Sequence, residues 1–127
     1  MLQFWIGEDD RNMVVSAMAK IEARSAICRL RKEGRLIPDE ATVLFASIAA
    51  EIRRLIEQPL NPPVLEVASG LVDRYDLRAS DAVQLGSAVV ARDLISAPEM
   101  RFVASDHALL SAAGEEGFTT WDPCADT

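Results

Sequence analysis

The chain has 127 residues, half of them hydrophobic and 26% charged, which suffices for one domain with a buried core. Its net charge of −7 argues against a protein that coats nucleic acid without sequence preference, because such binding requires a basic surface. No apolar run is long enough to span a membrane, and the opening residues, MLQFWIGEDD, lack the pattern of a signal peptide. The apolar neighbours of Cys28 predict a buried free thiol without a disulfide or metal-binding partner, so we expect a cytoplasmic protein.

The first half of the chain predicts one strand and two long helices. The β-branched run MVVSA at 13–17 is typical of a buried strand. Ser16 is placed to cap a helix over about 17–32, which Gly34 ends. Pro38, followed by two acidic residues, predicts the start of a second helix that extends to about residue 57.

The second half predicts alternating helices and strands. Asn61 followed by two prolines indicates the start of a helix over about 63–75. The remaining expected elements are a helix over 79–95, a strand over 101–105, a helix over 106–116 and a strand over 118–121. This alternation predicts a single α/β domain, with a parallel sheet covered by helices. Functional sites in such sheets form beyond the carboxyl ends of the strands.

Three acidic residues fall where such a site would form. Glu22 and Asp81 each lie beside the apolar stripe of an expected helix, and Asp106 directly follows an expected strand. We therefore expect their carboxylates to converge at one end of the sheet. Oxygen ligands without paired His or Cys residues favour Mg²⁺ or Mn²⁺ over zinc.

Each of these acids also has a purely structural alternative. Asp106 is placed to cap a helix, and Asp81 is placed to complement a helix dipole from the first turn. Glu22 is within reach of an ion pair with Arg24 or Arg29. The occurrence of all three acids at the junctions between sheet and helices favours the site.

Three segments, in this order and spacing, resemble the PIN-domain ribonucleases, especially the VapC-type toxins of bacterial toxin–antitoxin pairs. The segments are VVSAMAKIEARSAICRLRKEGRL at 14–36, LRASDAVQLGSAVV at 77–90 and RFVASDHALLSAAGEEGF at 101–118, and the resemblance extends over about 12–123. It implies a three-layer PIN-like fold and hydrolysis of RNA phosphodiester bonds that depends on Mg²⁺ or Mn²⁺. Carried over by position, the metal-binding and catalytic residues are Glu22, Asp81 and Asp106, with Ser105 beside the metal.

The resemblance also implies partners for the chain. The family's usual protein partner is a cognate antitoxin that blocks the active site, and its members commonly form homodimers. The RNA products would carry a 5′-phosphate and a 3′-hydroxyl. Six basic residues lie between positions 20 and 35, either as a solvated helix face or as a strip that faces phosphate. Among them, Lys20, Arg24 and Arg31 are candidates for contacts with the RNA backbone.

The N-terminal segment departs from the pattern of the family. Members open with an apolar strand that ends in a metal-binding Asp, whereas residues 1–10 resemble the tail of the following helix and its loop. We therefore expect a domain that is N-terminally truncated relative to the family, with Asp9 and Asp10 in an exposed turn. The sequence therefore leaves two functions open. The first is a metal-dependent ribonuclease, for which we expect little RNA cleavage by the chain without an N-terminal extension. The alternative is a catalytically impaired domain that binds RNA or an antitoxin without cleavage.

Overall fold

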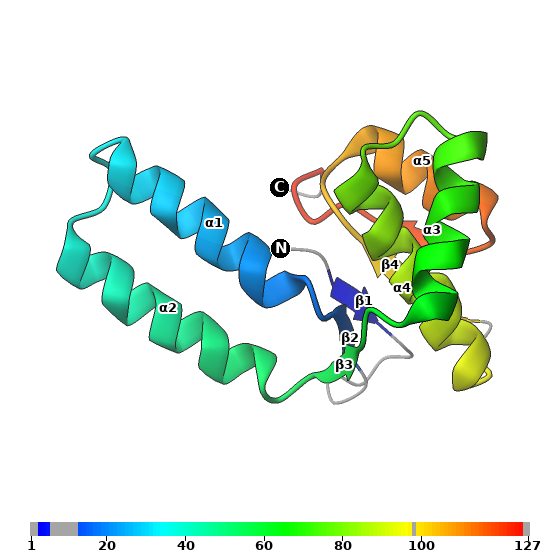
Figure 1. Ribbon diagram of the computed structural model, residues 1–127, viewed down its shortest axis with the longest axis horizontal. Helices are drawn as coiled ribbons and strands as arrows, with labels where there is room; N and C mark the ends of the chain where they lie inside the picture. The colour runs from blue at the N-terminus through cyan, green and yellow to red at the C-terminus, as the bar shows by residue number, and fades with distance from the viewer. Residues whose placement is uncertain (1–2, 6–12, 98, 126–127) are drawn as a thin grey trace.

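The computed structural model describes residues 3–5, 13–97 and 99–125, and it shows a mixed α/β protein (Figure 1). The strands are β1 (Gln3–Trp5), β2 (Met13–Ser16), β3 (Ile56–Gln58), β4 (Arg101–Val103) and β5 (Thr119–Trp121). The helices are α1 (Ala19–Lys32), α2 (Pro38–Ile52), α3 (Pro62–Arg74), α4 (Ala79–Leu94) and α5 (His107–Glu115). Asp9 and Asp10, for which an exposed turn was expected, lie outside the described residues.

The strands form one sheet in the order β3-β2-β1-β4-β5. Strand β1 runs antiparallel to both of its neighbours, β2 and β4, while the outer pairs β2–β3 and β4–β5 are parallel. The four strands other than β1 therefore run in the same direction, and their carboxyl ends share one edge of the sheet. Helices α1 and α5 follow β2 and β4 along the chain, so both begin near this edge.

Two expectations about the N-terminal segment are wrong. Residues Gln3–Trp5 form a strand and not the tail of a helix, and this strand fills the central position that the sequence appeared to lack. The sheet is consequently mixed and not parallel. The physical reason is backbone pairing: Phe4 is in register with Val14 on one side and with Phe102 on the other, which satisfies the inner edges of β2 and β4.

The expected boundaries also change around the first two helices. Helix α1 begins at Ala19 rather than at 17, and the Ser16 hydroxyl accepts a hydrogen bond from the Met18 amide at 3.2 Å, ahead of the helix. Helix α2 ends at Ile52, and the chain then turns so that β3 pairs with β2. Cys28 is only partly buried, although a buried thiol was expected. The predicted positions of α3, α4 and α5 are confirmed to within one or two residues.

The main hydrophobic core lies on one face of the sheet. It joins residues of α3, α4 and α5 to inward-facing side chains of the strands, including Leu71, Leu85, Leu109, Val14 and Phe102. A second, smaller core of Val15, Ala19 and Ile52 lies on the other side of β2, because neighbouring residues of a strand point to opposite faces. The base of the α1–α2 hairpin is thereby fixed to the sheet.

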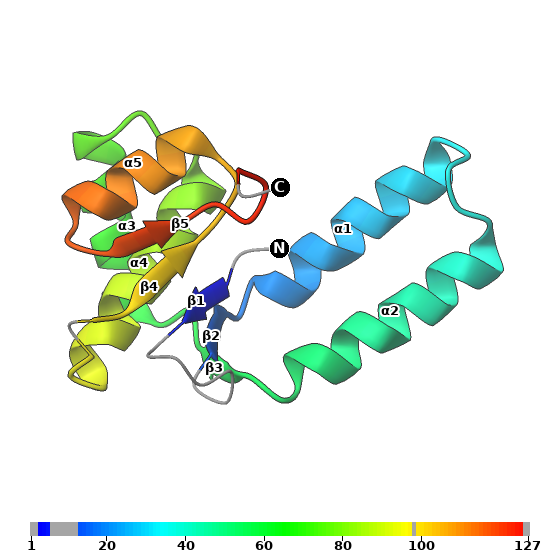
Figure 2. The same ribbon diagram turned by 180° about the vertical axis from the view of Figure 1, so that it is seen from behind.

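The remainder of the α1–α2 hairpin extends away from the sheet as an arm (Figures 1 and 2). Gly34, in the turn between the two helices, has a φ of 76°, a conformation that glycine adopts without strain. Within the part of the chain that the structure describes, no helix is both long enough and apolar enough to cross a membrane.

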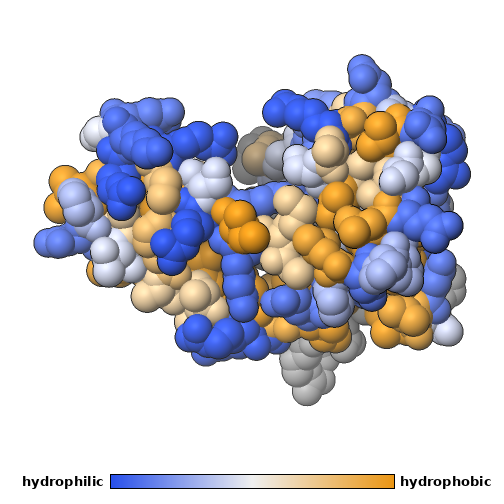
Figure 3. Space-filling model, in the orientation of Figure 1, coloured by the Kyte–Doolittle hydropathy of each residue, from blue (hydrophilic) through white to orange (hydrophobic). Residues whose placement is uncertain are grey.

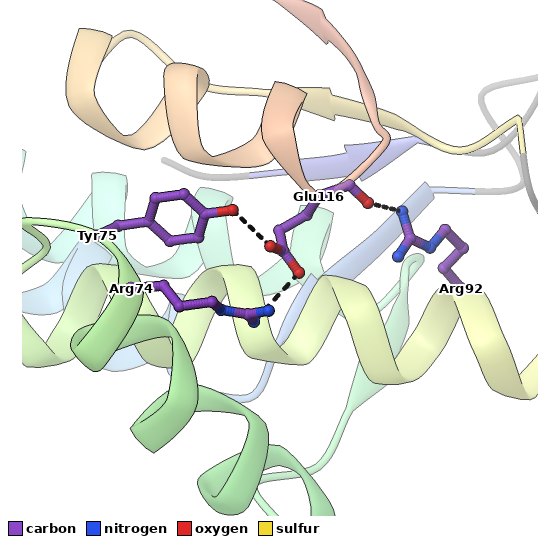
Figure 4. Close-up of polar contacts among 4 residues, drawn as sticks. All are labelled: Arg74, Tyr75, Arg92 and Glu116. Atoms are coloured by element: carbon purple, nitrogen blue, oxygen red, sulfur yellow. Dashed lines mark hydrogen bonds and ion pairs between the residues drawn. The ribbon is translucent and has the colours of Figure 1, made fainter.

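A polar cluster ties together the ends of α3, α4 and α5 (Figure 4). The Tyr75 hydroxyl donates to Glu116 Oε2 at 2.5 Å, and the Arg74 guanidinium lies 3.4 Å from the other carboxylate oxygen. From α4, Arg92 donates to the backbone carbonyl of Glu116 at 2.8 Å and lies over the ring of Phe118. The hydrogen bond to Glu116 raises the pKa of Tyr75, as do burial and the negative charge of Glu116. The cluster thus anchors the loop that leads into α4.

Candidate functional site

A cavity of about 700 Å³ separates the α1–α2 hairpin from the first turns of α4. Figure 3 shows the surface hollowed between the hairpin and the rest of the molecule, with hydrophobic and hydrophilic residues side by side there. The apolar lining comes from both helices of the hairpin, for example Ile21, Leu44 and Ile48. The charged lining includes the two acidic residues Glu22 and Asp81. Two of the acids singled out in the sequence therefore share one cavity.

Asp81 occupies the first turn of α4 and is partly buried. Burial raises the pKa of its carboxyl group, and the negative charge of Asp106 raises it further, whereas Arg78 lowers it. Asp106 therefore acts electrostatically on Asp81, although it does not line the cavity. A cation near Asp81 would remove the repulsion that the two carboxylates exert on each other.

Glu22 lies in the first turn of α1, where it receives a hydrogen bond from the side-chain amide of Gln84 in α4. Its polar partner in the described chain is therefore Gln84 and not Arg24 or Arg29, the two expected alternatives. The Gln84 side chain is only 4% exposed, and its carbonyl oxygen Oε1 is buried without a hydrogen-bond partner among the described residues. An orphaned buried oxygen of this kind is uncommon in folded proteins and calls for a donor.

Asp106 and Ser105 follow β4 at the same edge of the sheet. The Asp106 carboxylate accepts a hydrogen bond from the Leu109 amide at 3.0 Å and so caps α5, as its structural alternative predicts. The Ser105 hydroxyl lies 3.3 Å from the sulfur of Cys124. Both residues are exposed, so these contacts leave oxygen atoms of each accessible to solvent.

The basic residues of α1 divide between the two sides of the hairpin. Lys20, which forms an ion pair with Glu57, and Arg24, which lies over the ring of Phe45, line a separate pocket on the other side. Arg31 is exposed near the far end of α1, where it contacts Cys28. The candidates for RNA contacts, Lys20, Arg24 and Arg31, thus lie away from Glu22 and Asp81. The cavity is instead flanked by Arg29 from α1 and Arg78 at the start of α4.

Carboxylate oxygens of the kind that line the cavity are the donors that hard divalent cations prefer. Across residues 3–5, 13–97 and 99–125, no group of three or more His, Cys, Asp or Glu side chains is close enough to hold a metal ion. Mg²⁺, however, is commonly bound by one or two carboxylates together with several water molecules. Glu22 and Asp81 supply two carboxylates of this kind from two helices.

Sequence reasoning missed Gln84. A neutral polar residue on a helix face that is otherwise apolar gives a weak signal by itself. Its position three residues after Asp81, however, places both side chains on one face of α4, and this spacing could have identified it.

No protein-family model matches the chain, and no curated protein matches it in sequence.

Proposed function

We propose that the protein is a metal-dependent ribonuclease of the PIN-domain type, similar to VapC toxins, that hydrolyses RNA phosphodiester bonds. The observation that carries this proposal is the shared cavity, in which Glu22 of α1 and Asp81 of α4 lie beside the unpaired oxygen of Gln84. The four strands other than β1 run in one direction, and α1 and α5 begin near the edge that their carboxyl ends share, which supports a site at the place the resemblance implies.

In this proposal Glu22 and Asp81 would hold Mg²⁺ or Mn²⁺ together with water molecules, while Asp106, with Ser105 before it, would add negative charge near Asp81. A bound divalent cation supplies a Lewis acid that lowers the pKa of water and offsets charge on the phosphate. The chain itself contributes orientation: Arg29 and Arg78, on opposite flanks of the cavity, are placed to contact phosphate oxygens on either side of the scissile bond. Lys20, Arg24 and Arg31 would contact RNA only where it extends around the hairpin.

The proposed partners follow the same resemblance. We propose a cognate antitoxin that covers the cavity, and a homodimer as the form in solution. The α1–α2 arm exposes apolar side chains such as Ile21 and Val43, which are 67% and 66% exposed and are available for such contacts.

Three observations favour a second function, binding of RNA or an antitoxin without cleavage. Asp106 caps α5, and no three acids of the described chain form a metal-binding group. Strand β1 also contains no acidic residue, so its central position provides no further carboxylate.

A cleavage assay distinguishes the two functions. The chain is incubated with end-labelled RNA and Mn²⁺ or Mg²⁺, beside the variants Asp81→Asn and Glu22→Gln. Cleavage that yields 5′-phosphate ends, requires the metal and is lost in both variants supports the ribonuclease. RNA binding with no metal-dependent cleavage supports the binding protein. Cleavage that persists with a metal chelator would refute the proposed chemistry.

A further inference from the structure

Gln84 connects two helices at the cavity through one half of its side-chain amide. The nitrogen Nε2 donates a hydrogen bond to Glu22 Oε1, across the gap between α4 and α1. The oxygen Oε1 is buried and accepts no hydrogen bond from the described residues. Because Gln84 is one of the few polar residues in the interior, an unused oxygen at this position is unfavourable unless a donor reaches it from the cavity.

The charge of Glu22 determines the orientation of the amide. An ionised carboxylate accepts hydrogen bonds and cannot donate them, so Glu22 binds the N–H end of Gln84. The carbonyl end is then left for a donor that is neither Glu22 nor Asp81. A water molecule in the hydration shell of a divalent cation is such a donor, and its polarised O–H groups suit a carbonyl acceptor.

A second polar contact joins α4 to the segment that precedes α1. One turn further along α4, the Ser87 hydroxyl lies 3.3 Å from the Ser16 hydroxyl at the end of β2. Ser16 in turn accepts from the Met18 amide, just before α1. Because Ser87 and Ser16 also connect this region to α4, the contact of Gln84 with Glu22 is one of two polar contacts there.

We propose that Gln84 is a positioning residue: its amide nitrogen holds Glu22 beside Asp81, and its carbonyl oxygen accepts a hydrogen bond from a water molecule of a hydrated divalent cation in the cavity. The part of this inference that concerns the cation-bound water rests on the proposed function. The part that concerns the position of Glu22 depends only on the hydrogen bond between Gln84 and Glu22.

The contact with Glu22 is tested without metal, through the side-chain amide signals in a ¹H–¹⁵N NMR spectrum. Glu22→Gln should move the signals of Gln84 and leave those of Gln58 in place. Gln58 is a matched internal control, because it is also buried but donates to the backbone carbonyl of Pro59. Unchanged Gln84 signals would overturn the positioning of Glu22. Titration of the original chain with Mg²⁺ should then shift Gln84 and not Gln58, and equal or absent shifts would overturn the contact with cation-bound water.

The effect on affinity is tested with Gln84→Met, which keeps the length and volume of the side chain and removes the amide. We expect Mn²⁺ to bind about 10- to 100-fold more weakly, the usual loss when a residue that orients metal ligands is removed. The melting temperature without metal should change little, because the variant removes an unpaired buried oxygen together with the hydrogen bond to Glu22. Gln58→Met is the control and should not change Mn²⁺ affinity.

The outcomes separate this inference from the proposed function. If the original chain binds Mn²⁺ and Gln84→Met binds it equally well, the inference is wrong and the metal site remains. If the original chain does not bind Mn²⁺, the proposed metal-dependent function fails together with the part of the inference that concerns the cation-bound water. The metal-free NMR comparison still decides the contact between Gln84 and Glu22.

Discussion

At Gly86 the backbone of α3 packs closely against α4. A Cβ atom at residue 86 would lie 3.1 Å from the carbonyl oxygen of Val64 and 3.2 Å from the amide nitrogen of Ala68. Both atoms belong to the backbone, so neither can rotate away, and α3 would have to shift. Because Gly86 lies two residues after Gln84, this contact also sets the position of the α4 turns that carry the candidate site.

Gly86→Ala should therefore destabilise the protein despite the better helix propensity of alanine. The propensity gain is about 0.5–1 kcal/mol, whereas overpacking of a close helix contact costs roughly 1–3 kcal/mol. We expect a net loss of about 0.5–2 kcal/mol in the free energy of unfolding. Gly70→Ala, in α3, is the matched control: its Cβ meets nothing within 4 Å, so only the propensity gain of about 0.5–1 kcal/mol applies.

Urea unfolding followed by circular dichroism measures both variants against the original chain. Because the propensity gain is common to both, the difference between Gly86→Ala and Gly70→Ala isolates the packing cost, about 1–3 kcal/mol. Equal stabilisation by the two substitutions would show that α3 and α4 do not approach each other closely at Gly86, and the geometry of the site would have to be revised.

Three further predictions concern titration and assembly. Burial and Asp106 raise the pKa of Asp81, so the folded protein keeps this proton to a higher pH than the unfolded chain, and the contribution of Asp81 to metal-free stability should fall as pH rises above 3.8. Urea unfolding across this range should show that the original chain loses stability relative to Asp81→Asn as pH rises, and a constant difference between the two would contradict the assignment. Tyr75 is the single tyrosine, so tyrosinate absorbance should report its pKa above 10.0, and Glu116→Gln should lower it; identical titrations would exclude the hydrogen bond. Light scattering should detect a dimer at high concentration, and a strictly monomeric protein would contradict this proposal.

The well-predicted elements are those with local signals. Asn61 accepts a hydrogen bond from the Val64 amide and caps α3, which begins at the two prolines that marked it in the sequence. Asp106 likewise caps α5. Such caps depend on residues within one turn of each other, so the sequence alone contains the information.

The elements that were missed depend on partners far along the chain. Strand β1 is three residues long, and it exists because β2 and β4 offer backbone groups on both sides. The helical spacing of Ile48, Ile52 and Leu55 continues past the end of α2, so it concealed the turn before β3. Pairing of β3 with β2 joins segments about forty residues apart, which local periodicity does not register.

The candidate site was predictable in part for the same reason. Acids beside apolar helix stripes pointed to Glu22 and Asp81, and the structure places both along one cavity. Which residues of α1 face the cavity and which face the separate pocket was not predictable, because this depends on where α2 packs. Lys20 and Arg24 therefore face one pocket, while Glu22 faces the other.

Isothermal titration calorimetry with Mn²⁺ tests most directly whether Glu22 and Asp81 form a cation site. The original chain is compared with Asp81→Asn and with Asp93→Asn, the same substitution about 18 Å further along α4, where the carboxylate is exposed. We expect saturable binding by the original chain and by Asp93→Asn, and at least about tenfold weaker binding by Asp81→Asn. Equal affinity in all three proteins, or no binding by the original chain, would contradict a cation site at Glu22 and Asp81.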